Sequence, residues 1–201
     1  MAGQARCGHC GAHNRVGMPL GLPTPRAVGG FDHARKHTNI CITVIGDDPV
    51  RALREVATRA PDVTSLHSIQ WPGASSAAPV YASVRMGDIR GYRTYVHLFA
   101  VPVEQEPWAE AFFEGHVAAS DAVLLTSWSP RVYGWPEELH RWLAAGLAAA
   151  RVPRVALLGG DWLRPAWTER SATPTLYCGQ DAIAAVKVIA KDVLTWLAKG
   201  K

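Results

Sequence analysis

Runs of β-branched residues alternate along this chain with stretches in which apolar residues recur at helical spacing. Residues 40–45, ICITVI, form a continuous run rich in β-branched residues that ends at Gly46, which is typical of a strand buried on both faces of a parallel sheet. Asp48 then predicts a helix N-cap and Pro49 the first helical position, and the helical spacing continues to about residue 60. The regular part of the chain therefore opens with a strand, a glycine turn and a helix.

The centre of the chain predicts an antiparallel hairpin. Residues 79–85 and 92–101 are rich in aromatic and β-branched residues, and Gly87 and Gly91 lie between the two runs. A buried hairpin is the simplest interpretation of this pattern. The preceding residues 61–78 are rich in Ser, Pro and Ala, and they predict a loop.

Strands and helices continue to alternate toward the C-terminus. The expected elements are a short amphipathic helix (107–119), a buried strand (122–126), a helix (136–151), two further strands (152–158 and 175–178) and a last helix that starts from the N-cap Asp181. Such an order predicts an α/β domain in which helices cover a mostly parallel sheet.

The central stretch also carries a family resemblance. Residues 86–102, MGDIRGYRTYVHLFAVP, resemble the second and third strands of the bacterial Ras-like GTPases of the gliding-motility and polarity type, the MglA family. In that family the segment runs into a Val-Pro-Gly-Gln turn, whereas Val103 stands at the glycine position here. The resemblance covers about residues 39–201, and it implies a Ras-like three-layer α/β sandwich with a mostly parallel central sheet.

The phosphate-binding motif of such GTPases is missing. A P-loop, G-x4-G-K-[ST], brings backbone N–H groups, a lysine ammonium and a magnesium-binding hydroxyl onto the phosphates. Counted from Gly46, its last three positions are Arg51, Ala52 and Leu53. No lysine lies anywhere between Lys36 and Lys187, so no residue in that stretch can supply the missing ammonium.

The residues that stand at the motif positions are poor substitutes. The planar guanidinium of Arg51 does not match a compact ammonium packed under a phosphate. Asp47 and Asp48 place negative charge where the phosphate would lie, and they should repel it. We therefore expect a degenerate nucleotide site.

The guanine-reading motif is missing as well. In the GTPase family the strand matched by residues 152–158 ends in Asn-Lys-x-Asp, and here it ends in Gly159, Gly160, Asp161 and Trp162. The only asparagines are Asn14 and Asn39, so no Asn-Lys-x-Asp motif follows that strand. Trp162 stands at the guanine-reading position, either as a plug for an empty base pocket or as an ordinary loop residue.

Composition agrees with one α/β core and a small appendage. The chain has 201 residues, of which 48% are hydrophobic and 19% are charged. No apolar run approaches the roughly 20 residues that a membrane helix needs, and the N-terminus lacks the apolar part of a secretory signal. We therefore expect a cytoplasmic protein.

Positive charge gathers near the N-terminus. Residues 1–38 carry five Lys and Arg against one Asp, whereas residues 39–201 are formally neutral within the net charge of +4. With a single aromatic residue, Phe31, among these charges, the segment is a weak match to nucleic-acid binding, and we expect no nucleic-acid partner.

Residues 1–38 are predicted to form a flexible tail with a zinc knuckle. Cys7 and Cys10 are spaced so that two thiolates can reach one tetrahedral zinc ion. His33 and His37 have the spacing of a helical ligand pair, although the gap from the cysteines exceeds the usual one. The alternative is an unstructured leader with incidental cysteines.

These observations favour a catalytically inactive relative of small GTPases, a pseudo-GTPase that binds a protein partner and no nucleotide cofactor. The resemblance implies a roadblock-type regulator or an active MglA-like GTPase as that partner, in bacterial polarity or motility. One alternative is an atypical nucleotide-binding protein that uses Arg51 and the N–H groups at the helix start. The other is a zinc-bearing adaptor that acts through its tail.

Overall fold

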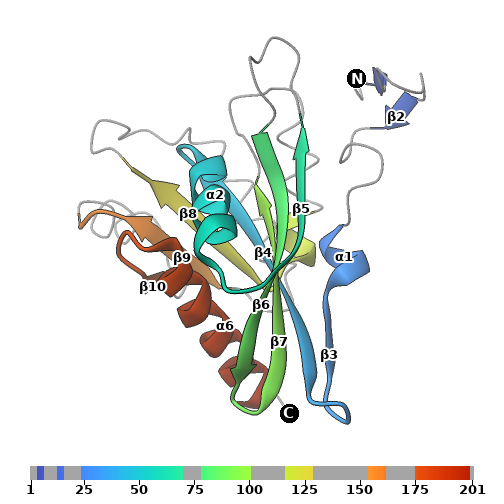
Figure 1. Ribbon diagram of the computed structural model, residues 1–201, viewed down its shortest axis with the longest axis vertical. Coiled ribbons are helices and arrows are strands. Elements are labelled where there is room, and N and C mark those ends of the chain that lie inside the picture. The colour runs from blue at the N-terminus through green and yellow to red at the C-terminus, as the bar shows by residue number, and fades with distance from the viewer. Residues whose placement is uncertain are drawn as a thin grey trace.

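The computed structural model describes residues 4–6, 13–15, 24–69, 78–100, 116–128, 154–161 and 175–199. In chain order the elements are β1 (Gln4–Arg6), β2 (His13–Arg15), α1 (Pro25–Val28), β3 (Gly30–Asp32), β4 (His37–Gly46), α2 (Pro49–Arg59), β5 (Val63–Ile69), β6 (Ala78–Ile89), β7 (Tyr92–Ala100), β8 (Ala122–Ser127), β9 (Val155–Gly159), β10 (Thr175–Tyr177) and α6 (Ala182–Lys199) (Figure 1).

One large sheet runs through these elements in the order β10-β9-β8-β4-β7-β6-β5, with β3 added to β4. Neighbouring strands from β10 to β7 are parallel, whereas β5, β6 and β7 are joined antiparallel. From β4 the chain crosses to the edge strand β5 and returns through β6 to β7 beside β4, and on the other side it continues outward through β8 and β9 to β10. This order and these directions define the Ras-like α/β fold that the alternation of strands and helices predicted.

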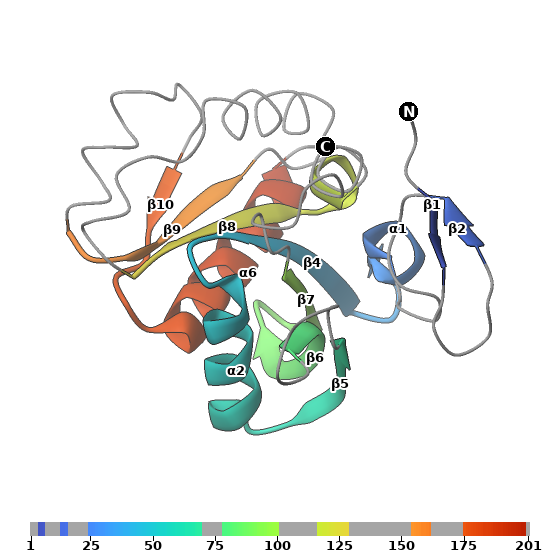
Figure 2. The ribbon, with the colours of Figure 1, turned by 90° about the horizontal axis from the view of Figure 1, so that it is seen from above.

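The two faces of the sheet are covered differently. Helices α2 and α6 lie together on one face, over a core that includes Ile42, Leu98 and Leu124 (Figure 2). On the opposite face, α1 packs through Val28 against a smaller cluster of buried residues, Cys41, Tyr81 and Phe99. Residues in the central strands are buried from both sides, which explains why β4 and β8 have continuous apolar runs.

Both predicted N-caps are confirmed. The Asp48 carboxylate accepts the Arg51 N–H at 3.1 Å at the start of α2, with Pro49 in the first turn. The Asp181 carboxylate accepts the Ala184 N–H at 3.0 Å at the start of α6. Local sequence therefore sets where these helices begin.

Residues 61–78 are not a continuous loop as predicted, because residues 63–69 form the edge strand β5, antiparallel to β6. Its Ser, Thr and His residues hide the strand signal, and Val63 and Leu66 are exposed. An edge strand has only one neighbour and one half-covered surface, so its sequence needs little apolar character.

The sheet also begins earlier than the expected boundary at residue 38. Helix α1 and strand β3 precede that boundary, and β3 pairs with β4. Although His33 and His37 have the spacing of a helical pair, residues 33–36 form the turn between these two strands. The predicted helix 136–151 and most of the predicted helix 107–119 lie outside the described residues.

Candidate functional site

The connection between β4 and α2 stands at the position of a P-loop. Strand β4 ends at Gly46 and α2 begins at Pro49, so only Asp47 and Asp48 lie between them. A P-loop needs four residues between its glycines before the lysine that opens the helix. The helix here begins three positions before Ala52, which stands at the place of that lysine, so the connection is too short to surround a phosphate.

Gly46 is required by a close approach to the neighbouring strand. Its φ is +119°, and a Cβ atom there would lie 2.2 Å from the Thr126 carbonyl oxygen. The Asp47 N–H donates to that same oxygen at 3.0 Å. The Thr126 hydroxyl in turn donates to the Asp47 carbonyl at 2.7 Å. The connection is therefore tied directly to β8.

Trp128 lies over the same connection from the end of β8. Its backbone N–H donates to the Asp47 carboxylate at 3.0 Å, and its indole Nε1–H donates to the Asp48 carbonyl at 3.2 Å. The Arg51 guanidinium stacks on the indole, with its Cζ 4.1 Å from the ring centroid. Polar groups that would have to contact a phosphate are thus bonded to the protein itself.

The start of α2 offers few donors to an anion. Pro49 has no N–H, and the Asp48 side chain accepts the N–H of Arg51. The Asp48 carboxylate also brings a negative charge to the end of the helix dipole that would otherwise attract a phosphate. The N-terminus of α2 is therefore capped by the protein's own carboxylate, which disfavours the binding of an anion there.

Of the other residues predicted at the degenerate site, Gly160 is described and buried, just beyond the end of β9. Beside it, the Tyr177 hydroxyl donates to the Gly159 carbonyl at 3.2 Å and contacts the Asp161 carboxylate at 2.8 Å. Val103 and Trp162 lie outside the described residues. The structure therefore brings together Gly46, Asp47, Asp48 and Arg51. Gly160 also lies at the carboxyl ends of the strands, but it follows β9, which is two strands away from β4.

The candidate zinc ligands are in two separate places. Cys7 and Cys10 lie outside the described residues, between the paired strands β1 and β2. His33 Nδ1 lies 2.9 Å from the Tyr92 hydroxyl, and His37 stacks on Tyr95. Within the described part of the chain, no three His, Cys, Asp or Glu residues are grouped as metal ligands.

A buried polar row crosses three strands on the face opposite α2 and α6. The Tyr81 hydroxyl lies 2.8 Å from His97 Nδ1, and His97 Nε2 lies 3.3 Å from the Asn39 side-chain oxygen. Since that amide oxygen can only accept, Nε2 carries the proton and the tyrosine donates to Nδ1. Burial, with a smaller effect of nearby His37, lowers the pKa of His97 to about 4.

Sequence reasoning missed the two residues that close the connection, Thr126 and Trp128. Neither belongs to a recognised motif. The one available signal is their position at the end of the strand 122–126, since carboxyl ends of parallel strands meet at one edge of a sheet. An alternation of strands cannot by itself say which strand is the neighbour of β4.

The strand order and directions are those of a small-GTPase-like fold, and the β4–α2 connection is bonded to Trp128 and to the start of α2. No protein-family model and no curated protein matches the chain. Among solved structures, the cytosolic domain of the T. maritima FeoB iron transporter in a GDP form is similar at 13% identity and a TM-score of 0.43. The match covers 77% of this chain and 63% of that one. Strand order and direction define the fold independently of this likeness.

The helices in the described part of the chain include none that is both long and apolar enough to cross a membrane.

Proposed function

We propose that this protein is a pseudo-GTPase, a catalytically inactive small-GTPase-like protein that acts in the cytoplasm by binding a protein partner. The observation that carries the proposal is the two-residue connection between β4 and α2, with both aspartates and Trp128 engaged in closing it. This arrangement agrees with the absence of the P-loop lysine, and it disfavours an atypical phosphate site built on Arg51, whose guanidinium stacks on the indole.

The partner proposed from the resemblance to the MglA family is a roadblock-type regulator or an active MglA-like GTPase, in bacterial polarity or motility. Strand β5 supports a role in binding a protein. It is the end strand of the sheet order, it carries no formal charge, and half of the Leu66 surface is exposed. Edge strands of this kind can add a strand from another chain.

Calorimetry with GTP, GDP and ATP in the presence of magnesium tests the first half of the proposal, after the purified protein has been checked for bound nucleotide. We expect no binding up to about millimolar nucleotide, which corresponds to roughly 4 kcal/mol. Micromolar binding of any of the three would contradict a pseudo-GTPase.

The second half is tested by mixing the protein with purified roadblock and MglA-like proteins from the same genome and measuring complex formation by light scattering. Leu66→Glu on β5 should weaken the complex, because it places a charge on the exposed edge. Val188→Glu on α6 is the matched control, since that side chain is similarly exposed, at 44% against 50%. Equal loss in both variants, or no complex at all, would count against β5 as the binding edge.

A zinc-bearing adaptor is the second candidate. The pairing of β1 with β2, in which Arg6 lies opposite His13, supports it because Cys7 and Cys10 fall in the short connection between two paired strands. Zinc knuckles commonly place two thiolates in such a connection. Equimolar zinc in the purified protein, lost on replacing both cysteines with Ser, is the expected result, and a folded protein without zinc would contradict it.

A further inference from the structure

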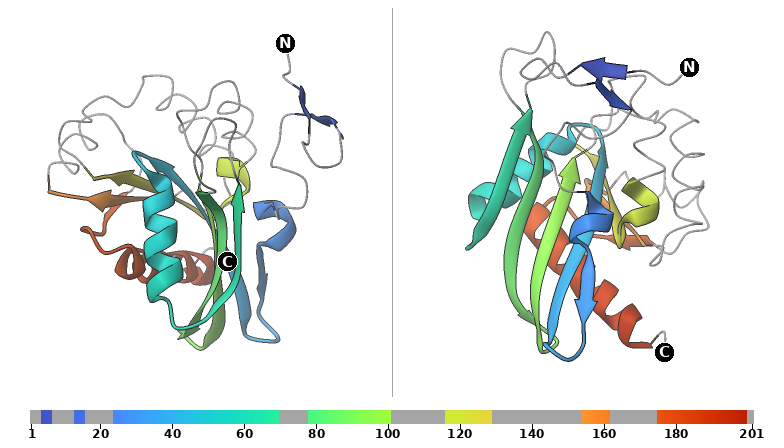
Figure 3. Two further views of the ribbon diagram at one scale, coloured as in Figure 1. Left: turned by 45° about the horizontal axis from the view of Figure 1, so that its top comes forward. Right: turned by 90° about the vertical axis from the view of Figure 1, so that its right-hand side faces the viewer.

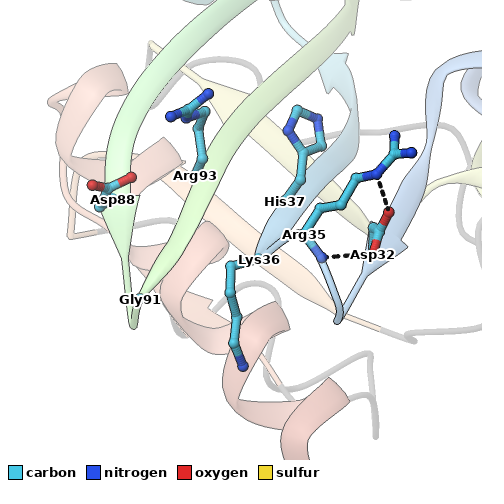
Figure 4. Close-up of a pocket in the computed structure, with 7 residues that line it drawn as sticks. All are labelled: Asp32, Arg35, Lys36, His37, Asp88, Gly91 and Arg93. Atoms are coloured by element: carbon cyan, nitrogen blue, oxygen red, sulfur yellow. Dashed lines mark hydrogen bonds and ion pairs between the residues drawn. The ribbon is translucent and has the colours of Figure 1, made fainter.

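A second polar site lies at the opposite end of the sheet from the closed connection. There the β3–β4 and β6–β7 hairpins end side by side, and the Arg93 N–H donates to the Lys36 carbonyl at 2.8 Å (Figure 3). A cavity of about 480 Å³ opens between the two tips. It is lined by Asp32, Arg35, Lys36, His37, Asp88, Gly91 and Arg93 (Figure 4).

Positive charge predominates at these tips. Residues 32–37 and 88–93 hold four Lys and Arg, two Asp and two His. His37 and Arg93 are opposite each other in the parallel pairing of β4 with β7, and Arg35 lies on the other side of His37 in Figure 4. The guanidinium groups of Arg93 on β7 and of Arg35 in the turn before β4 thus lie on either side of the His37 imidazole in that view.

The two carboxylates reduce this charge without reversing it. The Asp32 carboxylate contacts Arg35 within the same turn: it accepts the Arg35 N–H at 3.0 Å and lies 3.7 Å from the Arg35 guanidinium. That ion pair is exposed, so an incoming anion can compete for the guanidinium. Asp88 stands opposite Arg93 in the β6–β7 register, and within the described residues Arg93 makes no ion pair.

Backbone conformation is unusual at both tips. Lys36 and Arg90, at the turns of the two hairpins, have φ values of +51° and +52°. Gly or Asn is usual at such positions, and a long side chain there costs about 1 kcal/mol. Strain of this kind is concentrated at sites of function. Both tips therefore carry a basic residue in a backbone conformation that costs some stability.

We propose that this cavity, here called the hairpin-tip pocket, is a binding site for a phosphate group carried by a small molecule or a lipid headgroup. Arginine forks match phosphate oxygens in pairs, and the pocket joins two of them with an imidazole where the β3–β4 and β6–β7 hairpins meet. This site is distinct from the nucleotide position and does not depend on the pseudo-GTPase proposal.

Amide NMR of the full chain, titrated with inorganic phosphate at constant ionic strength, tests the proposal. The expected result is a saturable shift of the amides of His37, Gly91 and Arg93, and a smaller effect from succinate, a dicarboxylate without phosphate geometry. Shifts confined to other residues, or equal effects of phosphate and succinate, would overturn it.

The variant Arg35→Gln with Arg93→Gln should weaken phosphate binding at least about tenfold, because charge-assisted hydrogen bonds are lost. The matched control is Arg26→Gln with Arg54→Gln, which removes two exposed arginines from α1 and α2. The control should change the affinity less than about twofold, since only a screened long-range charge is removed. The same loss in both variants would sink the proposal, and the amide spectrum itself reports whether each variant is folded.

Vesicles distinguish the two sources of phosphate. Phosphatidylcholine vesicles containing phosphatidylinositol 4-phosphate should retain the protein in a sedimentation assay, in a manner sensitive to the Arg35 and Arg93 changes, if the ligand is a headgroup. Binding of inorganic phosphate without vesicle binding assigns the pocket to a small molecule. Failure of both probes contradicts the hairpin-tip pocket as a phosphate site, while leaving the nucleotide calorimetry unaffected.

Discussion

At the carboxyl ends of the parallel strands, polar groups of this protein bond one another, whereas at the amino ends they surround a cavity. Asp47 and Asp48 are tied to Thr126, Trp128 and the start of α2. At the hairpin tips, charged side chains line the open pocket. Open α/β sheets usually bind ligands outside the carboxyl ends of their strands.

The difference teaches that a fold can keep its topology while its usual site is closed. At the β4–α2 connection, the turn at Gly46, the Asp48 cap of α2 and Trp128 are enough to satisfy the polar groups by hydrogen bonds within the protein. Closing the connection at the carboxyl ends of the strands does not involve the hairpin tips at the opposite end of the sheet, where the pocket lies. Function on such a scaffold has to be argued from the side chains at each end.

Gly46→Ala should have the largest effect on stability, because it disturbs the close contact between the β4–α2 connection and β8. A Cβ there meets the Thr126 carbonyl oxygen at 2.2 Å in a backbone conformation with positive φ, so we expect a loss of about 4 kcal/mol in the free energy of unfolding. Gly87→Ala is the control, because Gly87 has positive φ and no atom near the added methyl group. It should cost about 1 kcal/mol by denaturant titration. Equal costs would show that the approach to β8 is not tight.

Acidification should lower the free energy of unfolding through His97. The pKa of His97 is about 4 in the folded protein, below the ordinary histidine value of 6.5. The unfolded chain therefore binds more protons between these values, so stability is full above pH 6.5 and falls as the pH drops toward 4, by up to about 3 kcal/mol. His97→Gln keeps a donor and an acceptor for Asn39 and Tyr81 but cannot titrate.

Denaturant unfolding of both proteins at several pH values isolates this effect, since other titrating groups are common to the two. The variant should lack the histidine contribution, and its stability should fall less between pH 6.5 and pH 4. Parallel curves for the two proteins would mean that His97 does not resist protonation in the folded state.

Trp128→Ala opens the closed end without lengthening the connection. Loss of the partly buried indole should cost about 2 kcal/mol in the free energy of unfolding. Nucleotide binding should still be absent by calorimetry, because two residues cannot form the phosphate cradle. Trp128→Phe, which keeps a ring but loses the Nε1–H donor, should cost less. Micromolar GTP binding by the alanine variant would instead identify the indole as the main obstacle.

Lys36→Asn should give the smallest effect, and in the opposite direction. Asparagine tolerates the positive φ of residue 36, so the free energy of unfolding should rise by about 0.5 kcal/mol. Arg35→Asn is the control, since Arg35 does not have positive φ, and it should bring no such gain. If both changes stabilise equally, charge repulsion at the tips and not backbone strain is being relieved.

Much of the fold could be predicted from the sequence because its signals are local. Apolar runs located β4 and β8, helical spacing located α2 and α6, and Asp48 and Asp181 marked helix starts that the structure confirms. The absence of a lysine between Lys36 and Lys187 and the two aspartates after Gly46 are equally local features, and together they predicted a degenerate phosphate site. Such features depend on each residue and its close neighbours in the chain.

Other features depended on which segments meet in space. Strand β5 was missed because an edge strand needs little apolar character, and the helical spacing of His33 and His37 was misleading because the pairing of β3 with β4 is invisible in that spacing. The contact of Trp128 with Asp47 joins residues 81 positions apart. The hairpin-tip pocket likewise joins two turns more than 50 residues apart. The sequence by itself determined most of the strands and helices and the missing motif. Only the tertiary structure decided which end of the sheet is closed and which is open, because hydrogen bonds and charges act over distance in space and not along the chain.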